Sequence, residues 1–476
     1  MSGFYLTADT TDDPAPVASG LAFARATNVT SFREDAVTGV VTRVDALAHW
    51  GPARDPASGV RVILGGRVAL EAETWRSAAD LPYEGGAAAK VVLAAWLERG
   101  ERIAPELNGA FAVAVVDPRE RRLHLFTDRI GMFPVFVATT GPLRLCTHPD
   151  VLADALARAG QPPTLDRTSV AELLATARGV HPYTYYREIR QLDAGTHHTW
   201  RLDRPEAAPS RREYWYPAYR DTPPPRRHQP ELIEELADAY RNAVRRRTHD
   251  FLGRPAVLLS GGADSRGVLF GLEDPSRAAC ITFYGEENAE LATARAIARA
   301  AGAEHHALRR DPEHYGLGAP ETVRISGAMF SANHGHQTRL LDRMRALGIG
   351  VLLSGCYADC LFKGWAYNAQ ARRVLGHPIR HLRRLRPYSY EFNPNFRSFP
   401  LRPERQAELQ ARFDREMAGI DTERYEETAL LVEERRVRPV IRVPAVAFQL
   451  INWRSLPCDM VFADSGLLDL FGRMSP

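Results

Sequence analysis

The sequence lacks the features that would place the protein in a membrane-bound or secreted class. No run approaches the roughly 20 consecutive apolar residues of a membrane span, and no basic segment with an apolar core begins the chain. The five cysteines are odd in number and scattered, which excludes a disulfide framework. Lysine occurs only at Lys90 and Lys363. We therefore expect a cytoplasmic protein with few candidates for a catalytic lysine.

The charges nearly cancel, with 61 Lys+Arg against 58 Asp+Glu and a formal net charge of +3. So small a balance predicts neither a nucleic-acid nor a membrane-surface partner. The chain has 476 residues, of which 45% are hydrophobic and 25% charged, as in ordinary folded proteins. That length predicts about two to four domains.

The first half of the chain, residues 1–202, is predicted to be rich in antiparallel strands. Residues 61–70, RVILGGRVAL, predict a strand, a Gly-Gly break and a second strand. Residues 87–99 carry apolar residues at helical spacing. Two further strands, 111–116 and 123–126, flank a turn that contains Asp117-Pro118.

The composition changes to Pro, Arg and Asp between residues 203 and 229, which we interpret as a linker. From residue 230 to 476, helical stretches alternate with short apolar strands, as in a mostly parallel sheet covered by helices. Among them are strands at 256–259 and 351–353. Residues 372–403 are dense in Arg, Pro and Asn and predict an irregular insertion.

One segment of the second half predicts a phosphate site. Residues 257–269, VLLSGGADSRGVL, pass from an apolar strand through a tight loop into a helix. Glycines expose backbone N–H groups, and Ser260 and Ser265 add hydroxyls where the helix dipole favours an anion. No Gly-Lys-Ser/Thr follows, so this is not a Walker loop, and the pattern is not a hydrolase nucleophile elbow. Asp264 in this loop suits a Mg²⁺ that bridges carboxylate and phosphate oxygens.

This Ser-Gly-Gly-x-Asp-Ser sequence resembles the pyrophosphate loop of ATP pyrophosphatases, and its flanks are similar to the asparagine synthetase group. Residues 281–285, ITFYG, and His305-His306 resemble the segments that line the adenosine site there. The resemblance implies ATP and Mg²⁺ as cofactors. It implies nucleotide binding by Leu259, Ser260, Gly261, Gly262, Asp264, Ser265, Thr282, Phe283, Gly285, Ser354 and Gly355.

Residues 353–362, LSGCYADCLF, are similar to the second signature of that group, Leu-Ser-Gly-Glu-Gly-x-Asp-Glu-Leu-Phe. The match implies that Asp359 is the second magnesium ligand beside Asp264. Cys356 replaces the family's glutamate, and Tyr357 follows it as a candidate catalytic residue. Lys363 is the candidate for the family's catalytic lysine, which usually lies in helices beyond the residues matched here. The C-terminal end is therefore expected to be short.

The first half resembles the class II glutamine amidotransferase domain at residues 107–112, 117–119 and 127–135. Together the two resemblances imply an α/β fold. An N-terminal Ntn-hydrolase-like αββα sandwich would be followed by a doubly wound, mostly parallel ATP pyrophosphatase domain of the adenine nucleotide alpha hydrolase type.

The residues that would bind and hydrolyse glutamine depart from this family. Ser2 stands in place of the N-terminal cysteine, Gly65-Gly66-Arg67 in place of Asn-Gly-Glu, and Ala88 in place of the aspartate that binds the amine. A polar ligand without matched partners binds poorly. We therefore expect an inactive glutaminase, as in the related β-lactam synthetases and lasso-peptide cyclases, whose substrates supply the attacking amine themselves.

Two other patterns predict no site of their own. His305-His306 and His334-Gly335-His336 have no further ligand at zinc spacing, so no zinc site is expected there. The arginine clusters at 241–247 and 380–386 are expected to be solvated faces.

The leading functional hypothesis is an ATP-dependent ligase that adenylates a carboxylate and joins it to an amine, with AMP and pyrophosphate as by-products. The alternatives are asparagine synthase, driven by Ser2 or by free ammonia, and an ATP-binding protein without catalysis. A tRNA-modifying pyrophosphatase would not explain the first half. The expected partners are a small-molecule or peptide carboxylate, a precursor peptide or partner protein, and a second copy in a homodimer, but no nucleic acid and no membrane.

Overall fold

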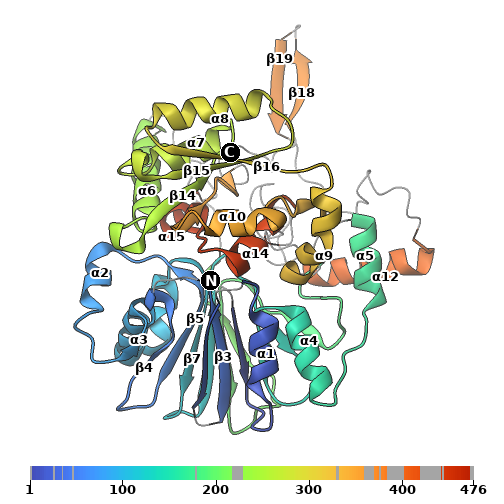
Figure 1. The fold of residues 1–476 in the computed structure, drawn as a ribbon. Helices are drawn as coiled ribbons and strands as arrows, with labels where there is room; N and C mark the ends of the chain where they lie inside the picture. The colour runs from blue at the N-terminus through green and yellow to red at the C-terminus, as the bar shows by residue number, and fades with distance from the viewer. Residues whose placement is uncertain are drawn as a thin grey trace.

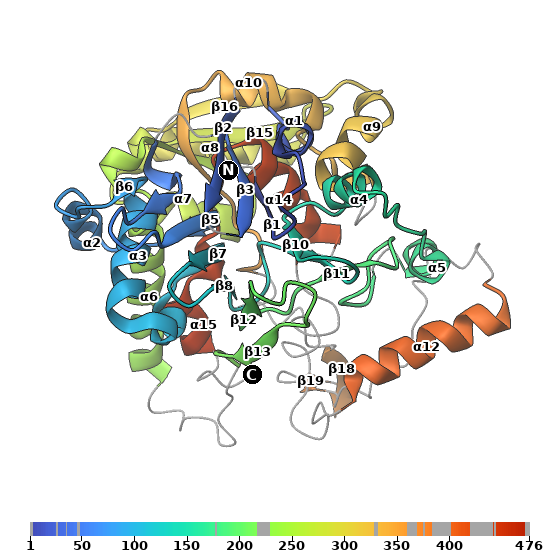
Figure 2. The ribbon, with the colours of Figure 1, turned by 90° about the horizontal axis from the view of Figure 1, so that it is seen from below.

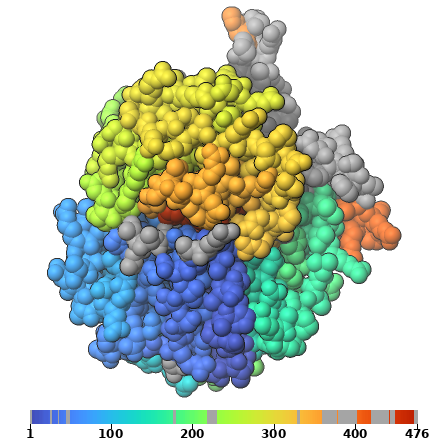
Figure 3. Space-filling view, in the orientation of Figure 1, coloured from blue at the N-terminus to red at the C-terminus, as the bar shows by residue number. Residues whose placement is uncertain are grey.

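The computed structural model of the protein describes most of the two predicted halves. The described residues are 3–24, 27–34, 36–44, 48–176, 179–216, 229–327, 332–358, 369–374, 377–382, 401–418, 441 and 444–471. In Figure 3 the first half, coloured blue to teal, lies below the second half, coloured yellow-green to orange, and the two are in broad contact.

Two antiparallel sheets form the first half. The first sheet has six strands in the order β11-β9-β10-β1-β3-β2. Its strands are β1 (Gly3–Thr7), β2 (Asn28–Glu34), β3 (Val37–Arg43), β9 (Phe136–Ala138), β10 (Arg144–Cys146) and β11 (Ile189–Gln191). The second sheet has seven strands in the order β13-β12-β8-β7-β5-β4-β6. Its strands are β4 (Ala53–Arg54), β5 (Arg61–Val68), β6 (Glu84–Gly85), β7 (Gly109–Asp117), β8 (Arg122–Thr127), β12 (Thr196–Arg201) and β13 (Ser210–Glu213).

Helices cover the outer faces of both sheets. On the first sheet lie α1 (Pro14–Leu21) and α4 (Pro149–Arg158), and on the second lies α3 (Ala87–Arg99), next to α2 (Ala72–Ser77) (Figure 1). Strand β7 is buried along its whole length, because its alternate residues face the first sheet on one side and α3 on the other. The four layers confirm the predicted αββα sandwich.

The second half is built on a four-stranded parallel sheet with the order β16-β15-β14-β17. Its strands are β14 (Arg254–Leu258), β15 (Ala279–Tyr284), β16 (Glu304–Arg309) and β17 (Ile349–Leu353). Helices α7 (Ala263–Phe270) and α8 (Ala289–Ala300) connect the first three strands, and α10 (Leu341–Arg345) precedes β17. Figure 1 shows α8 above the sheet and α10 below it, which confirms the doubly wound arrangement.

The remaining elements surround this core. Helix α6 (Gln229–Arg245) packs on α15 (Ser465–Phe471), and α9 (His314–Ser326) packs on α14 (Pro444–Ser455). Helix α12 (Pro403–Met417) lies beside α5 (Arg167–Thr176) at the rim (Figure 1, Figure 2). Strands β18 (Ala369–Val374) and β19 (His377–Leu382) pair as a hairpin within the stretch that was predicted to be irregular. Among the described residues, no helix combines the length and the apolar character needed to cross a membrane.

The predicted break at Gly65-Gly66 is wrong, because β5 runs through both glycines and pairs with β7 along its length. The glycines serve close packing instead. A Cβ at position 65 would lie 2.6 Å from the Phe133 ring, and one at position 66, where φ is 73°, would lie 2.2 Å from the Ala110 carbonyl oxygen. Strand β13 also extends the seven-stranded sheet into the stretch assigned to a linker.

A buried carboxylate joins the two halves. Asp464 is fully buried and accepts hydrogen bonds from Arg246 (3.1 Å) and Arg247 (2.9 Å) of the second half and from Asn108 (3.0 Å) of the first. Burial opposes its ionisation, but the guanidinium groups of Arg247 and Arg246 hold the pKa of Asp464 below its ordinary value. Removing one partner of such a group leaves a buried charge unpaired, which costs several kcal/mol.

A histidine forms a second link between the halves. His148 Nδ1 accepts hydrogen bonds from the backbone N–H groups of Asp150 (3.2 Å) and Val151 (3.4 Å) and so caps α4. Its Nε2 lies 3.0 Å from the carbonyl oxygen of Arg324 in the second half. Burial, and secondarily the charge of Arg454, hold the pKa of His148 well below 6.5.

This arrangement predicts a loss of stability in mild acid. The unfolded chain binds a proton at His148 near pH 6.5, whereas the folded chain does not, so the free energy of unfolding falls as the pH drops below about 6.5. His148→Asn keeps an oxygen that can cap α4 but removes the titration. Urea denaturation at about pH 7.5 and about pH 5.5 should show a smaller loss for the variant. Equal losses in both proteins would contradict this role of His148.

Candidate functional site

The candidate site lies where the order of the parallel strands reverses. After β14 the chain continues to β15 on one side, while β17 lies on the other side of β14. The loops that follow β14 and β17, residues 259–262 and 354–358, therefore leave the same edge of the sheet in neighbouring positions. Ligands of doubly wound sheets bind at this kind of switch point.

The loop after β14 is held in shape by its two serines. The Ser260 N–H donates to Ser265 Oγ (3.0 Å), the two hydroxyls lie 3.0 Å apart, and the Gly262 N–H donates to Ser260 Oγ (3.1 Å). The hydroxyls thus fold the loop over the start of α7. Ser265 is buried, whereas Gly262 is exposed. The loop therefore presents its backbone to a ligand and keeps its hydroxyl pair beneath.

The start of α7 suits an anion. Its N-cap, Gly262, makes no side-chain capping hydrogen bond, so the first amide groups of the helix are not covered by a cap. Asp264 lies half-buried in the first turn. A carboxylate beside a phosphate site is repelled by the phosphate unless a cation lies between them. Glycines, amide groups and one carboxylate therefore fit a Mg²⁺–phosphate ligand, in which Asp264 would hold the metal.

The structure brings the second signature against the first. A Cβ on Gly355 would lie 2.7 Å from Asp264 Cβ and 2.8 Å from both the Asp264 carbonyl carbon and the Ser265 nitrogen. Only a glycine allows the two backbones to approach this closely. The contact confirms that the two segments adjoin at one edge of the sheet.

A buried chain of amides fixes the second loop from behind. Gln449 Nε2 donates to Ser354 Oγ (2.5 Å), Asn452 Nδ2 donates to Gln449 Oε1 (2.9 Å), and Gln337 Nε2 donates to Asn452 Oδ1 (2.9 Å). All four side chains are buried. Gln449 and Asn452 were not among the predicted site residues, although two amides three residues apart in the apolar stretch of α14 are a signal of buried hydrogen bonding.

The segment expected to line the adenosine lies at the end of β15. Thr282 Oγ1 donates to the Leu259 carbonyl oxygen (2.7 Å) and lies 2.9 Å from His305 Nε2, so this hydroxyl links β15 to the loop after β14 and to β16. Phe283 and Gly285 are half-buried beyond it. A Cβ at Gly285 would meet nothing within 4 Å. The backbone at Gly285 therefore borders open space.

Tyr357 lies in the second loop with an unusual backbone. It is 3% exposed and has a φ of 78°, a left-handed conformation that a bulky residue seldom adopts. Such strain persists only where the surroundings impose it, and it is common at functional sites. Its assignment as a catalytic residue stays a prediction. Asp359, Lys363 and Ser2 lie outside the described residues.

The positions expected to have lost glutamine recognition are packed. Arg67 is 2% exposed, and its guanidinium lies 4.9 Å from the Trp50 ring centroid. Its Nη2 donates to the carbonyl oxygen of Gly350 in the second half (3.0 Å). Ala88, a residue of α3, is fully buried in the core between this helix and the seven-stranded sheet. Arg67 thus ties β5 to the parallel sheet.

Comparison with known proteins identifies the class. Residues 69–215 match the glutamine amidotransferase domain model, and residues 235–443 match the asparagine synthase model. The matched regions contain, in order, much of the sandwich and the parallel sheet with its two signature loops. The chain is a member of the asparagine synthase family.

Relatives and solved structures are distant. Proteins of Mycobacterium bovis and of two Mycobacterium tuberculosis strains, provisionally named asparagine synthetase (glutamine-hydrolyzing), are 25% identical over 313 residues. The match covers 65% of this chain and 46% of the relatives, so the chain spans about half their length. Two of the solved structures that resemble the chain are each 9% identical to it. Glutamine phosphoribosylpyrophosphate amidotransferase from B. subtilis has a TM-score of 0.31 and is matched over 64% of this chain and 65% of its own. An allosteric regulatory enzyme of purine biosynthesis has a TM-score of 0.32, with 65% and 80% covered.

Substitution of Gly355 tests the contact between the two loops. Gly355→Ala forces Cβ against the backbone at Asp264, so we expect the free energy of unfolding to fall by about 1–3 kcal/mol, as in other overpacked sites. Gly316→Ala is the control, because its Cβ would meet nothing within 4 Å. Since Gly316 lies within α9, the free energy of unfolding of the control should rise by about 0.5–1 kcal/mol. Denaturant titration measures both, and a harmless Gly355→Ala would contradict the contact.

Proposed function

We propose that the protein is an ATP-dependent ligase that adenylates a carboxylate and joins it to an amine without hydrolysing glutamine. The observation that carries the proposal is the contact of Gly355 with Asp264 and Ser265 at the switch point of the parallel sheet. It supports the proposal because the glycine-rich loop and the second signature loop adjoin at one edge of the sheet. The membership of the asparagine synthase family supports ATP as the co-substrate.

The reaction would proceed in two steps. A carboxylate oxygen of the substrate attacks the α-phosphorus of ATP, an acyl C–O–P bond forms, and the bond between the α-phosphorus and the bridging oxygen breaks. Pyrophosphate then leaves. An amine next attacks the acyl carbon, a C–N bond forms, AMP departs with the electron pair of the C–O bond, and the amine proton passes to a base. Tyr357 is the candidate catalytic residue for this second step.

The chain's own groups would act mainly on the pyrophosphate. The amide groups of Gly261 and of the first turn of α7 would bind the departing phosphates. The hydrogen bonds of the Ser260 and Gly262 N–H groups to the serine hydroxyls would keep the loop in shape. Asp264, with Asp359 as the partner implied by the signature, would hold Mg²⁺. The metal, when bound, would neutralise the charge that develops on pyrophosphate.

The first half supports the absence of glutamine hydrolysis. Arg67 replaces a family glutamate, and its side chain is buried against Trp50 and bound to Gly350 rather than free to anchor a ligand. Ala88 has no polar atom to bind the glutamine amine. The first half would then serve as a scaffold beneath the parallel sheet, and the amine would come from the substrate itself.

Analysis of the nucleotide products tests the proposal. The purified protein, incubated with Mg-ATP and an extract of the source cells, should form AMP and pyrophosphate. Asp264→Asn should lower the rate of AMP formation by roughly 100-fold or more, as loss of a transition-state contact does. Asp238→Asn makes the same charge change on the exposed face of α6 and should retain the activity. AMP formation that survives Asp264→Asn would refute the assignment.

The second candidate is asparagine synthase, which the names of the relatives favour. Mg-ATP, aspartate and either glutamine or ammonia separate the two activities. We expect no glutamate from glutamine and no asparagine. Asparagine formation would establish the second candidate, and glutamate release would overturn the inactive glutaminase. ATP binding without AMP from any substrate would instead favour a non-catalytic relative.

A further inference from the structure

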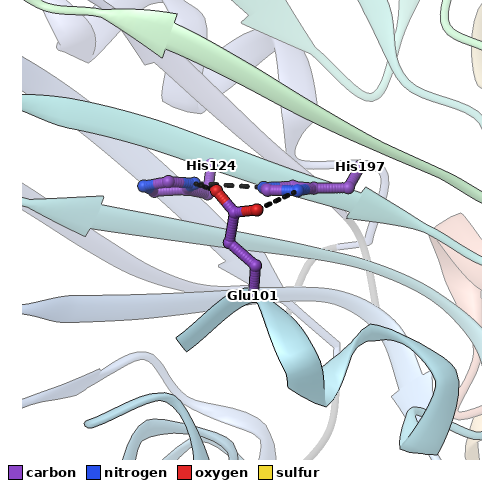
Figure 4. Close-up of side chains that lie close together, drawn as sticks. All are labelled: Glu101, His124 and His197. Carbon is purple, nitrogen blue, oxygen red and sulfur yellow. Dashed lines mark hydrogen bonds and ion pairs between the residues drawn. The ribbon is translucent and has the colours of Figure 1, made fainter. Parts of the chain in front are cut away.

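Two buried histidines and a carboxylate meet on the outer face of the seven-stranded sheet, in the first half of the chain (Figure 4). His124 lies on β8 and His197 on the neighbouring β12, where Thr199 is directly opposite His124. Glu101 reaches them from the 3₁₀ helix Gly100–Glu106, which covers this part of the sheet. None of the family signatures involves these residues.

The spacing of their polar atoms suits a tetrahedral metal ion. His124 Nδ1 and His197 Nε2 lie 3.0 Å apart, and Thr199 Oγ1 lies 3.3 and 3.1 Å from these two nitrogens. Glu101 Oε1 lies 3.9 Å from His124 Nδ1, and Glu101 Oε2 lies 3.7 Å from His197 Nδ1. Zinc–nitrogen bonds of 2.0–2.1 Å at tetrahedral angles place ligand atoms about 3.3–3.4 Å apart. Without metal, one of the two nitrogens donates a hydrogen bond to the other. A metal ion would take the place of that proton once the Glu101 carboxylate turns from His197 Nδ1 toward Nε2.

The surroundings favour neutral imidazoles as ligands. His124 and His197 are 1% and 3% exposed, the His124 ring packs on Trp96, and the His197 ring stacks on Phe126. Burial favours the neutral imidazole over the charged form, so each ring offers one lone pair. Glu101 is 40% exposed and gives the cluster an opening to solvent.

One atom of the cluster has an unmet hydrogen-bonding need. His124 Nε2 is buried and has no hydrogen-bond partner, and the nearest carboxylate oxygen, Glu120 Oε2, is 4.0 Å away. Zinc-bound histidines usually donate their second N–H to a carboxylate. Metal at Nδ1 would fix the proton on Nε2 and direct it toward Glu120. Arg212 Nη2, 3.7 Å from Glu101 Oε2, is a nearby positive charge that opposes the binding of a cation.

We propose that His124 Nδ1, His197 Nε2 and the Glu101 carboxylate form a Zn²⁺ site, with water beside Thr199 as the fourth ligand. The ion would join the 3₁₀ helix to strands β8 and β12. That helix leads directly to Asn108, which binds Asp464 of the second half. None of the signature residues takes part, so the site is independent of the proposed ligase chemistry.

Metal titration of the full chain tests this site. After chelator treatment and dialysis, the protein should bind Zn²⁺, and binding at one site should depend on Glu101. The variant should bind at that site at least about tenfold more weakly, since even the loss of an outer partner weakens zinc by that much. Glu98→Gln is the matched control, because Glu98 is an exposed carboxylate at the end of α3.

Two further readouts keep the result specific to these residues. Co²⁺ in place of Zn²⁺ should give the visible absorption of a tetrahedral N/O site, and Glu101→Gln and His197→Asn should abolish it. Zn²⁺ should also raise the thermal midpoint of the wild type and of Glu98→Gln, but not that of Glu101→Gln. If Glu101→Gln folds and binds Zn²⁺ as tightly as the wild type, or if no tetrahedral Co²⁺ spectrum is obtained, the proposal is wrong.

Discussion

The candidate site depends on the approach of two backbones at the edge of the parallel sheet. Gly355 lies so close to Asp264 and Ser265 that no side chain fits between them. Strand order makes the approach possible, because β14 and β17 are neighbours although about ninety residues of chain separate them. The serine pair of the first loop and the buried amides behind Ser354 hold the two loops in register. A site built this way is set before any ligand arrives, which is what stabilising a departing pyrophosphate requires.

The first half takes part in the same framework. Asp464 is bound by Arg246, Arg247 and Asn108, and Arg67 reaches from β5 to Gly350 in the strand that precedes the second loop. Arg67 stands where the resemblance places a family glutamate, and here its side chain packs between the two halves.

Local patterns in the sequence predict much of this structure. The helical spacing at residues 87–99 matches α3, the turn at Asp117-Pro118 separates β7 from β8, and the loop at residues 260–265 joins a strand to a helix. The wrong or missing predictions concern contacts between residues far apart in the sequence. Gly65 and Gly66 were predicted to break the strand, because the Phe133 ring and the Ala110 carbonyl that require glycines there are distant in sequence. Likewise, His124 and His197 are brought together only by the pairing of β8 with β12, and Gln449 finds Ser354 only when α14 packs behind the second loop.

The most direct test of the central claim is a crystal structure with Mg²⁺ and an ATP analogue in which a methylene group replaces the oxygen between the α- and β-phosphorus atoms. We expect the terminal phosphates to lie on the amide groups of Gly261 and of the first turn of α7, with Asp264 on the metal and the base near the end of β15. A nucleotide bound elsewhere, or phosphates directed away from the Gly355–Asp264 contact, would contradict it.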